Sequence, residues 1–267
     1  ARYIQIDIDG EEIGRNYEAL RLAGDARLAL AALSDELKKR DLARRQAGRK
    51  ALEDKIADGH AKFLAGSEAL RTSSRAPIRP ERLMEELAPR LRADDIVVAD
   101  ASYSSNWISN YLVAEEAGQR FLTPRGLAGL GWGLPMAMGA KVGNPDKRII
   151  CLAGDGGFAH CWVELETARR MGLAVTLMVL NNQILGYQKH AESLRFGMHT
   201  DAVHFEPVDH AAIARACGLP GIRVERADEI GPALDEALAN QSQTTLIDVM
   251  TDPDAHPPIT LFEDLQN

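Results

Sequence analysis

Two apolar segments in the second half of the chain constrain its fold more than any other feature. Ile149–Ala153 and Val175–Leu180 are short, continuous apolar runs without polar alternation, and glycine or asparagine follows each of them. Runs of this kind are typical of strands that are buried on both faces of a parallel sheet. Helical patterns lie before, between and after them. From residue 81 onward the sequence therefore predicts a doubly wound α/β domain, with helices on both faces of a parallel sheet.

The predicted elements alternate along this domain. We expect strands at Ile96–Ala99, Arg120–Thr123, Arg148–Ala153, Ala174–Leu180, Ile222–Glu225 and Thr245–Met250. We expect helices at Pro80–Leu91, Ser105–Leu112, Cys161–Met171, Asp209–Cys217 and Ile230–Ala239, with a glycine-rich segment and a helix over Gly126–Gly143. Lys189–Glu206 is polar and predicts a loop over the site, and the proline-containing tail Asp252–Asn267 predicts a lid.

Residues 1–70 form a separate predicted region. The chain opens on a β-branched strand, Ile4–Asp9, without a start methionine, so we expect it to begin inside a domain. A helical pattern follows up to about Arg71, and Lys38–Lys62 mixes both signs of charge, which predicts a solvated connecting helix. Residues 71–80, with serine, threonine and two prolines, predict a linker, so the second domain spans 81–267.

Charge and composition exclude several classes of function. The chain has 31 Lys and Arg against 39 Asp and Glu, a net charge of −8, which argues against nucleic acid or an anionic membrane as partner. The apolar run 173–180 is too short for a transmembrane helix. Three cysteines do not make a disulfide framework, and Cys151 and Cys161, beside His160, lack zinc-site spacing, so we expect core packing and a cytoplasmic protein.

Polar clusters follow three of the predicted strands, at Asp100–Asn106, Gly154–Gly157 and Asn181–Asn182. Ligands of open parallel sheets bind beyond the carboxyl ends of the strands. The small residues of Gly154–Gly157 let backbone N–H groups approach a phosphate, and Asp155 can hold a divalent cation. Taken alone, this segment is equally a glycine turn capped by an aspartate.

Asn182 strengthens the cation hypothesis. It lies 27 residues after Asp155, at the end of the next apolar strand, so neighbouring parallel strands bring the two side chains to one edge. A carboxylate, an amide oxygen, a backbone carbonyl and two phosphate oxygens make an octahedral site suited to Mg²⁺. Without that pairing, two asparagines after a strand are an ordinary turn.

Gly154-Asp155-Gly156 with Asn181-Asn182 resembles the diphosphate-binding motif of thiamine-diphosphate enzymes. Gly126–Pro135 resembles the segment that holds the aminopyrimidine in acetolactate synthase and its relatives. The opening strand, with Ile13–Tyr17 and Gly24–Ala26, resembles the end of that family's central domain. The resemblance implies that residues 1–70 end a second α/β domain and that 81–267 form the diphosphate- and Mg²⁺-binding catalytic domain.

The resemblance also implies individual roles. Asp155 and Asn182 would bind Mg²⁺ through side chains and Ile184 through its carbonyl, and Leu130 would press the cofactor into a bent shape from beneath the thiazolium. The backbone of Ala128 and Leu130 would bond the aminopyrimidine. The remaining predicted contacts, chiefly to the diphosphate, are Tyr103, Ser104, Gly154, Gly156, Gly157 and Gly186. Tyr103 and Ser104 depart from the Gln-His that the synthases often have there.

Tyr187 and Gln188 are expected to open a helix that faces the substrate. Pyruvate-type decarboxylases have a glutamate where Gln188 stands, so the neutral side chain favours a carboligase. Such an enzyme decarboxylates a 2-keto acid such as pyruvate and adds the enamine to an acceptor carbonyl. A thiamine-diphosphate-dependent decarboxylase or C–C lyase, and a non-catalytic subunit with the cofactor fold, stay open as alternatives. A nicotinamide oxidoreductase is disfavoured because Gly129-x-Gly131-x-Gly133 is not G-x-G-x-x-G.

The family's catalytic glutamate lies in an N-terminal pyrimidine domain that this sequence does not contain. The resemblance therefore implies a pyrimidine domain of the same or another chain as partner, in a homodimer or homotetramer. Asp7 and Asp25-Ala26 match positions where the synthases touch the adenosine half of FAD, which makes FAD a possible second cofactor.

Overall fold

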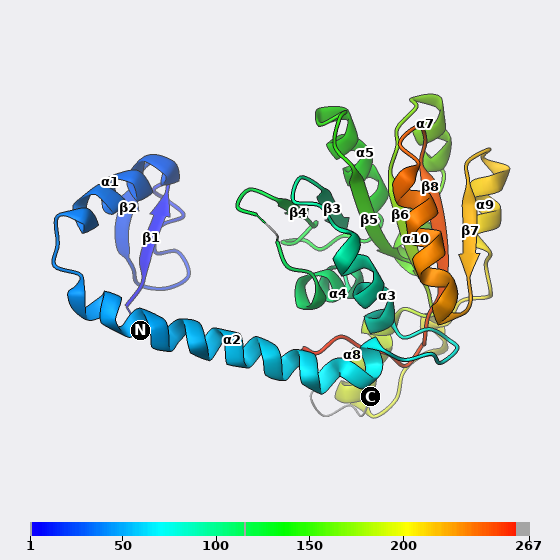
Figure 1. The fold of residues 1–267 in the computed structure, drawn as a ribbon, viewed down its shortest axis with the longest axis horizontal. Coiled ribbons are helices and arrows are strands. Elements are labelled where there is room, and N and C mark those ends of the chain that lie inside the picture. Colours follow the sequence, from blue (N-terminus) through cyan, green and yellow to red (C-terminus); the bar gives the residue numbers. More distant parts are fainter. Residues whose placement is uncertain (1, 115, 260–267) are drawn as a thin grey trace. The chain divides into compact units, whose positions relative to one another are not determined.

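The computed structural model describes residues 2–114 and 116–259 and contains two compact units (Figure 1). The first unit extends to Ala65 and the second begins at Gly66. The division falls within helix α2 (Ala43–Arg71), before the linker predicted at 71–80, so the linker residues belong to the second unit. Among the described residues, no helix combines the length and the apolar character needed to cross a membrane.

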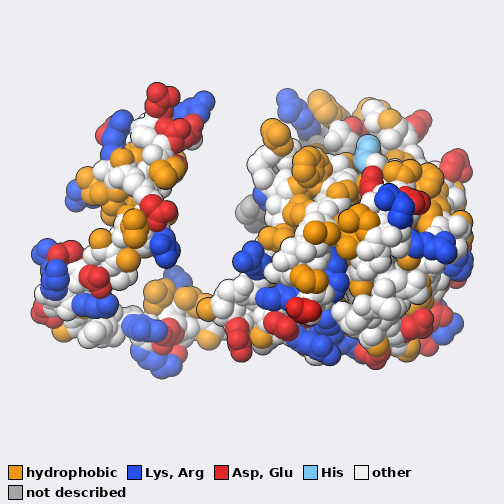
Figure 2. Space-filling model, turned by 90° about the horizontal axis from the view of Figure 1, so that it is seen from above, with side chains coloured by type: hydrophobic (Ala, Val, Ile, Leu, Met, Phe, Trp, Pro, Cys, Tyr) orange, Lys and Arg blue, Asp and Glu red, His pale blue; other side chains and the backbone are white. Residues whose placement is uncertain are grey.

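The first unit contains a parallel pair of strands, β1 (Ile4–Asp7) and β2 (Leu20–Ala23), and helix α1 (Ala26–Lys38). The opening strand ends two residues earlier than predicted, and β2 was not predicted. The helical pattern up to Arg71 contains two helices, α1 and α2. Ser67 is the only buried residue of α2, and on the face in Figure 2 acidic and basic side chains are interspersed.

The second unit is built on a six-stranded parallel sheet in the order β4-β3-β5-β6-β8-β7. The strands are β3 (Ile96–Ala99), β4 (Arg120–Leu122), β5 (Ile149–Gly154), β6 (Thr176–Asn181), β7 (Gly221–Val224) and β8 (Thr245–Met250). The helices are α3 (Pro80–Leu87), α4 (Tyr103–Tyr111), α5 (Gly133–Gly143), α6 (Asp155–Ala159), α7 (Glu164–Arg170), α8 (Gly186–Phe196), α9 (His210–Ala216) and α10 (Ile230–Ala239).

Alternate strand residues pack into two separate cores, one on each face of the sheet. Val97 and Ala99 contribute to a core with α3, α4 and α10, whereas Ile96 and Val98 contribute to a core with α5, α6, α7 and α9. Successive side chains of a strand point to opposite faces, so a strand that is apolar throughout must be covered on both. The predicted doubly wound parallel sheet is confirmed.

Two local predictions are corrected by the structure. The helix predicted at Cys161–Met171 is shorter, since α7 spans only Glu164–Arg170, and a short helix that was not predicted, α6, begins directly at Asp155. The loop predicted at Lys189–Glu206 is helical up to Phe196, where α8 ends in Gly197 with a left-handed φ of 71°. Tyr187 and Gln188 lie in the first turn of α8, as expected, but the polar sequence after them did not indicate that the helix continues, because it buries only a narrow face that includes His190.

The ends of the second unit also differ in detail from the prediction. The helix predicted at Pro80–Leu91 ends as an α-helix at Leu87 and continues as a 3₁₀ turn over Ala88–Arg90. Residues 260–267 of the predicted lid lie outside the described residues. Backbone bonds from Ile78 N to Met250 O and from Asp252 N to Ile78 O, both 2.9 Å, attach the linker to the chain after β8.

Candidate active site

A cavity of about 400 Å³ lies at the carboxyl ends of β3, β5, β6 and β8. Parallel strands end at a common edge, so the segments that follow them are brought together there although they are far apart in sequence. Every residue that the sequence analysis assigned to the site lines this cavity: Tyr103, Ser104, Ala128, Leu130, Gly154, Asp155, Gly156, Gly157, Asn182, Ile184, Gly186, Tyr187 and Gln188. Their individual roles stay predictions.

Asp155 joins the ends of β5 and β6. Its Oδ1 accepts a hydrogen bond from Gly156 N at 2.7 Å, and its Oδ2 accepts one from Gln183 N at 2.6 Å. Burial raises the pKa of the Asp155 carboxyl to about 6, although backbone donors oppose this shift. Each carboxylate oxygen has more than one lone pair, so both can still coordinate a cation.

The two asparagines at the end of β6, Asn181 within the strand and Asn182 directly after it, have different roles. The Asn181 side chain is buried and donates to Val208 O at 2.8 Å and to Asp248 Oδ1 at 2.9 Å. Asn182 points to the opposite side and lines the cavity, where its Oδ1 accepts from Ile184 N at 3.2 Å. The period of two along a strand separates a structural asparagine from an available one.

This set of groups fits a magnesium-bound diphosphate. Carboxylate, amide and carbonyl oxygens are the ligands that Mg²⁺ takes in proteins. No group of three or more His, Cys, Asp or Glu that could hold a metal occurs within 2–114 and 116–259, so a cation here would need ligand oxygens as well. Gly156 and Gly157 keep the turn compact, since an added Cβ would lie 2.7 Å from Leu185 Cδ2 or 2.2 Å from Asp100 Oδ2.

Asp100 holds the glycine-rich segment in place, a role that the sequence analysis missed. It is almost fully buried, and it accepts backbone hydrogen bonds from Ala101 N (2.8 Å), Gly131 N (3.0 Å) and Trp132 N (3.1 Å). Its position directly after a strand, at the head of a polar cluster, was the available signal. The segment that it anchors brings Leu130, 38% exposed, to the cavity wall.

Tyr103 connects α4 to α8 beside the cavity. Its hydroxyl lies 2.6 Å from His190 Nδ1, and its ring packs edge-on against Tyr187 with centroids 5.8 Å apart. Burial raises the pKa of the Tyr103 phenol, whereas burial and the neighbouring His256 lower the pKa of His190 to about 4. At neutral pH this is a hydrogen bond between two uncharged groups.

Other predicted residues are less enclosed. Gln188 is exposed and donates from Nε2 to Glu192 Oε1 at 2.6 Å, one helical turn further along α8. Cys151 and Cys161 pack in the core between the sheet and α5, α6 and α7, and burial raises the pKa of the Cys161 thiol to about 12. In the first unit, Asp25 caps α1 by accepting from Leu28 N at 3.0 Å.

The family model described as "Thiamine pyrophosphate enzyme, C-terminal TPP binding domain" matches residues 100–249, which include nearly the whole cavity wall. The chain belongs to the thiamine pyrophosphate enzymes. This confirms the family resemblance seen in the sequence motifs, and it identifies the cavity as part of a domain that binds thiamine pyrophosphate, also called thiamine diphosphate.

Relatives of this thiamine pyrophosphate enzyme carry several names. It is 29% identical over 267 residues to a probable acetolactate synthase large subunit of Methanococcus aeolicus, covering 95% of this chain and 43% of that protein. It is 28% identical to a sulfoacetaldehyde acetyltransferase of Castellaniella defragrans, covering 94% of this chain and 45% of that protein. The chain thus spans less than half the length of these relatives.

Comparison with solved structures also finds a thiamine diphosphate-dependent enzyme. The thiamine diphosphate-dependent 4-hydroxybenzoylformate decarboxylase of Rhodococcus jostii RHA1 superposes with a TM-score of 0.63 and 27% identity. The match covers 68% of this chain and 34% of that protein.

Proposed function

We propose that this chain forms the diphosphate- and Mg²⁺-binding half of a thiamine-diphosphate-dependent carboligase. The enzyme would decarboxylate a 2-keto acid such as pyruvate and join the remaining fragment to an acceptor carbonyl. One observation carries the choice of ligation over simple decarboxylation: no available carboxylic acid faces the substrate side of the cavity, within the described part of its wall. The three lining carboxylates belong to Asp100, Asp155 and Asp252.

Each of these carboxylates is engaged elsewhere. Asp100 accepts three backbone hydrogen bonds, and Asp155 is the proposed Mg²⁺ ligand. Asp252 accepts from Arg79 Nη1 at 3.4 Å and from Asp254 N at 2.9 Å. A simple decarboxylase must return a proton to carbon, whereas a carboligase needs an acceptor there instead. A cavity wall without an available acid therefore favours ligation to an acceptor over protonation.

The residues of this chain would bind and orient rather than react. Bound thiamine diphosphate supplies the carbon centre that takes up the electrons released by decarboxylation. Asp155, Asn182 and the Ile184 carbonyl would hold Mg²⁺, the backbone of Gly156 and Gly157 would contact the diphosphate, and Leu130 would support the thiazolium ring. Exclusion of water by the apolar wall would protect the reactive carbon until the acceptor binds.

The cofactor's proton chemistry would need a second domain. We propose that a pyrimidine domain, of the same or another chain, completes the site in a homodimer or homotetramer of a cytoplasmic protein. We also propose that the adenosine half of FAD binds against Asp7, Asp25 and Ala26. The Asp25 carboxylate already caps α1, which leaves its second oxygen for a ribose hydroxyl.

The test is a product analysis of the complete protein supplied with Mg²⁺, thiamine diphosphate and pyruvate. We expect one C–C product for each CO₂ released, little free acetaldehyde, and more acetaldehyde from Gln188→Glu. Acetaldehyde formed in proportion to CO₂ would instead support the decarboxylase suggested by the name of the Rhodococcus enzyme. Stoichiometric cofactor, read as thiochrome fluorescence, with no turnover of any 2-keto acid would support a non-catalytic subunit.

A further inference from the structure

Arg125 is the only Lys or Arg among the described residues that line the cavity. It lies in the segment between β4 and α5, immediately before the glycine-rich turn, and its side chain is exposed. Neither the Mg²⁺ site nor the diphosphate contacts proposed above use it. A lone cation in a cavity wall needs a reason, because the wall is otherwise apolar or neutral apart from three engaged carboxylates.

The contacts of Arg125 orient it without neutralising it. Its Nη2 donates to Ser105 Oγ and, at 2.6 Å, to Asn106 Oδ1, both in the first turns of α4. Neither partner is charged, and Arg125 forms no ion pair with any residue that the structure describes. Both bonds use the same terminal nitrogen. The donors on Nη1 and Nε therefore have no protein acceptor in the described part of the chain, and a planar fork of this kind matches an oxyanion.

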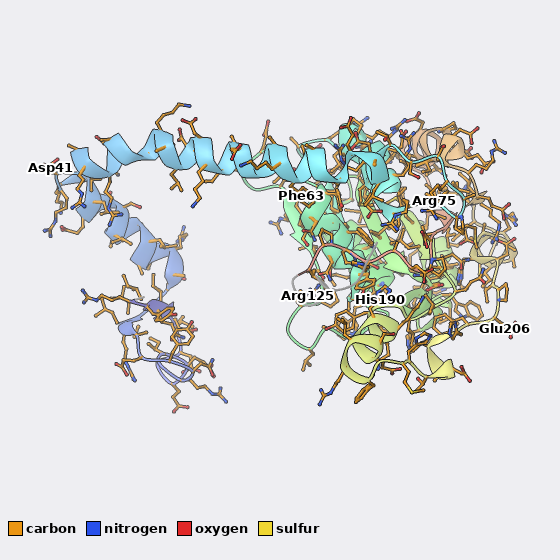
Figure 3. All side chains as sticks on the ribbon, turned by 90° about the horizontal axis from the view of Figure 1, so that it is seen from below. Asp41, Phe63, Arg75, Arg125, His190 and Glu206 are labelled. Carbon is orange, nitrogen blue, oxygen red and sulfur yellow. The ribbon has the colours of Figure 1, made fainter. Side chains whose placement is uncertain are left out.

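Arg125 follows a different strand from the two side chains proposed to bind Mg²⁺. It follows β4, the edge strand, while Asp155 follows β5 and Asn182 follows β6. With neighbouring strands about 4.8 Å apart, these two strand ends lie roughly 10 and 14 Å from the end of β4. Arg125, labelled in Figure 3, therefore enters the cavity wall from a different strand end than Asp155 and Asn182.

We infer that Arg125 binds an oxyanion that the acceptor substrate keeps in the product. This inference rests on the proposed carboligase function and narrows its substrate class. A cation paired with the carboxylate of the donor would stabilise the ground state and oppose its loss as CO₂, so such binding would slow decarboxylation. An anion that survives the reaction carries no such cost. The acceptor is therefore an anionic carbonyl compound, with a carboxylate or a sulfonate, rather than a neutral aldehyde.

The experiment compares acceptors with and without a negative charge in the complete, cofactor-loaded protein. Each is offered with pyruvate as donor: 2-ketobutyrate, sulfoacetaldehyde and neutral acetaldehyde. The measured quantity is the ratio of kcat/KM for each anionic acceptor to kcat/KM for acetaldehyde. We expect Arg125→Gln to lower this ratio on the order of 10- to 100-fold, because a charged hydrogen bond to the acceptor is lost. Arg125→Lys, which keeps the positive charge, should restore part of the ratio. Whichever of 2-ketobutyrate and sulfoacetaldehyde has the higher kcat/KM shows whether the site takes a carboxylate or a sulfonate.

Arg120→Gln is the matched control. Arg120 opens the same strand, β4, but at its amino end, away from the cavity, and it should leave the ratio unchanged. An equal effect of Arg125→Gln on charged and neutral acceptors would overturn the inference, since it would indicate a structural tether between the turn and α4. Weaker retention of thiamine diphosphate in Arg125→Gln would overturn it as well, because the oxyanion would then be the diphosphate.

A binding measurement separates failure of this inference from failure of the proposed function. Calorimetric titration of the loaded protein would use unreactive L-lactate, 2-hydroxyethanesulfonate and neutral 1,2-propanediol. Arg125-dependent binding of an anion without any C–C product would support the oxyanion site and refute the carboligase. A C–C product with no Arg125-dependent anion binding and no change in the ratio would refute the oxyanion site alone.

Discussion

Gly157 offers the sharpest test of how the cavity is assembled. A methyl group added there would lie 2.2 Å from Asp100 Oδ2, a distance that real Cβ atoms do not adopt. The obstructing atom is not the tip of a flexible chain, because Asp100 is held by three backbone N–H groups. Gly157→Ala must therefore displace the carboxylate that anchors the glycine-rich segment at Gly131 and Trp132.

The expected cost follows from those hydrogen bonds. Each bond to a charged acceptor contributes about 1.5–3 kcal/mol, and a displaced Asp100 loses at least the one to Gly131 and weakens the others. Alanine in place of a helical glycine stabilises the helix by up to about 1 kcal/mol, which offsets part of this loss. The net loss in the free energy of unfolding is then about 2–4 kcal/mol, and the affinity for thiamine diphosphate should fall with it, since the anchored segment carries Leu130.

The assay is urea unfolding of the complete protein, together with thiochrome measurement of retained cofactor. Gly139→Ala is the control: it lies in α5, no atom is within 4 Å of its added Cβ, and it should gain about 0.4–1 kcal/mol. Wild-type stability and wild-type cofactor retention in Gly157→Ala would refute the reasoning, because Asp100 would then be free to move at no cost.

Three further outcomes are expected. Asp155→Asn, which removes the charge and turns an amide donor toward Gln183 N, should weaken Mg²⁺-dependent cofactor retention on the order of 10-fold or more, measured by thiochrome fluorescence after desalting. Asp248→Ala should cost about 3–5 kcal/mol in urea unfolding, because it strips a buried acceptor from Asn181 and Arg223. The lowered pKa of His190 means that the unfolded chain takes up its proton near pH 6.5 and the native chain only near pH 4. The free energy of unfolding should therefore fall by at most about 3 kcal/mol as the pH is lowered from 6.5 to 4. His190→Gln should make the free energy of unfolding less dependent on pH in this range.

Much of the site was predictable from local sequence. Asp155 and Asn182 each follow an apolar run, and parallel strands that are consecutive in the chain usually end side by side. β5 and β6 are such neighbours, so the two side chains reach the same cavity without any further information.

Other features depend on partners that local patterns do not identify. From Lys189 onward α8 was predicted as a loop because most of its residues are polar, and only contacts made by His190 and its neighbours reveal a buried face. The strand pattern alone does not distinguish Asn181 from Asn182, and only the resemblance to the cofactor motif favoured Asn182. The buried Asp248 on β8 determines which of them is structural, through its bond to Asn181 Nδ2.

The sequence by itself determined the class of fold and the family, because strand length, apolar continuity and motif spacing are local quantities that survive without knowledge of strand order. Only the tertiary structure decided what Asp100, Tyr103 and Arg125 contact. Their partners lie 31, 87 and 20 residues away, on segments brought near by the order of the strands in the sheet. That order is fixed by the packing of both cores together, and no single segment of the chain encodes it.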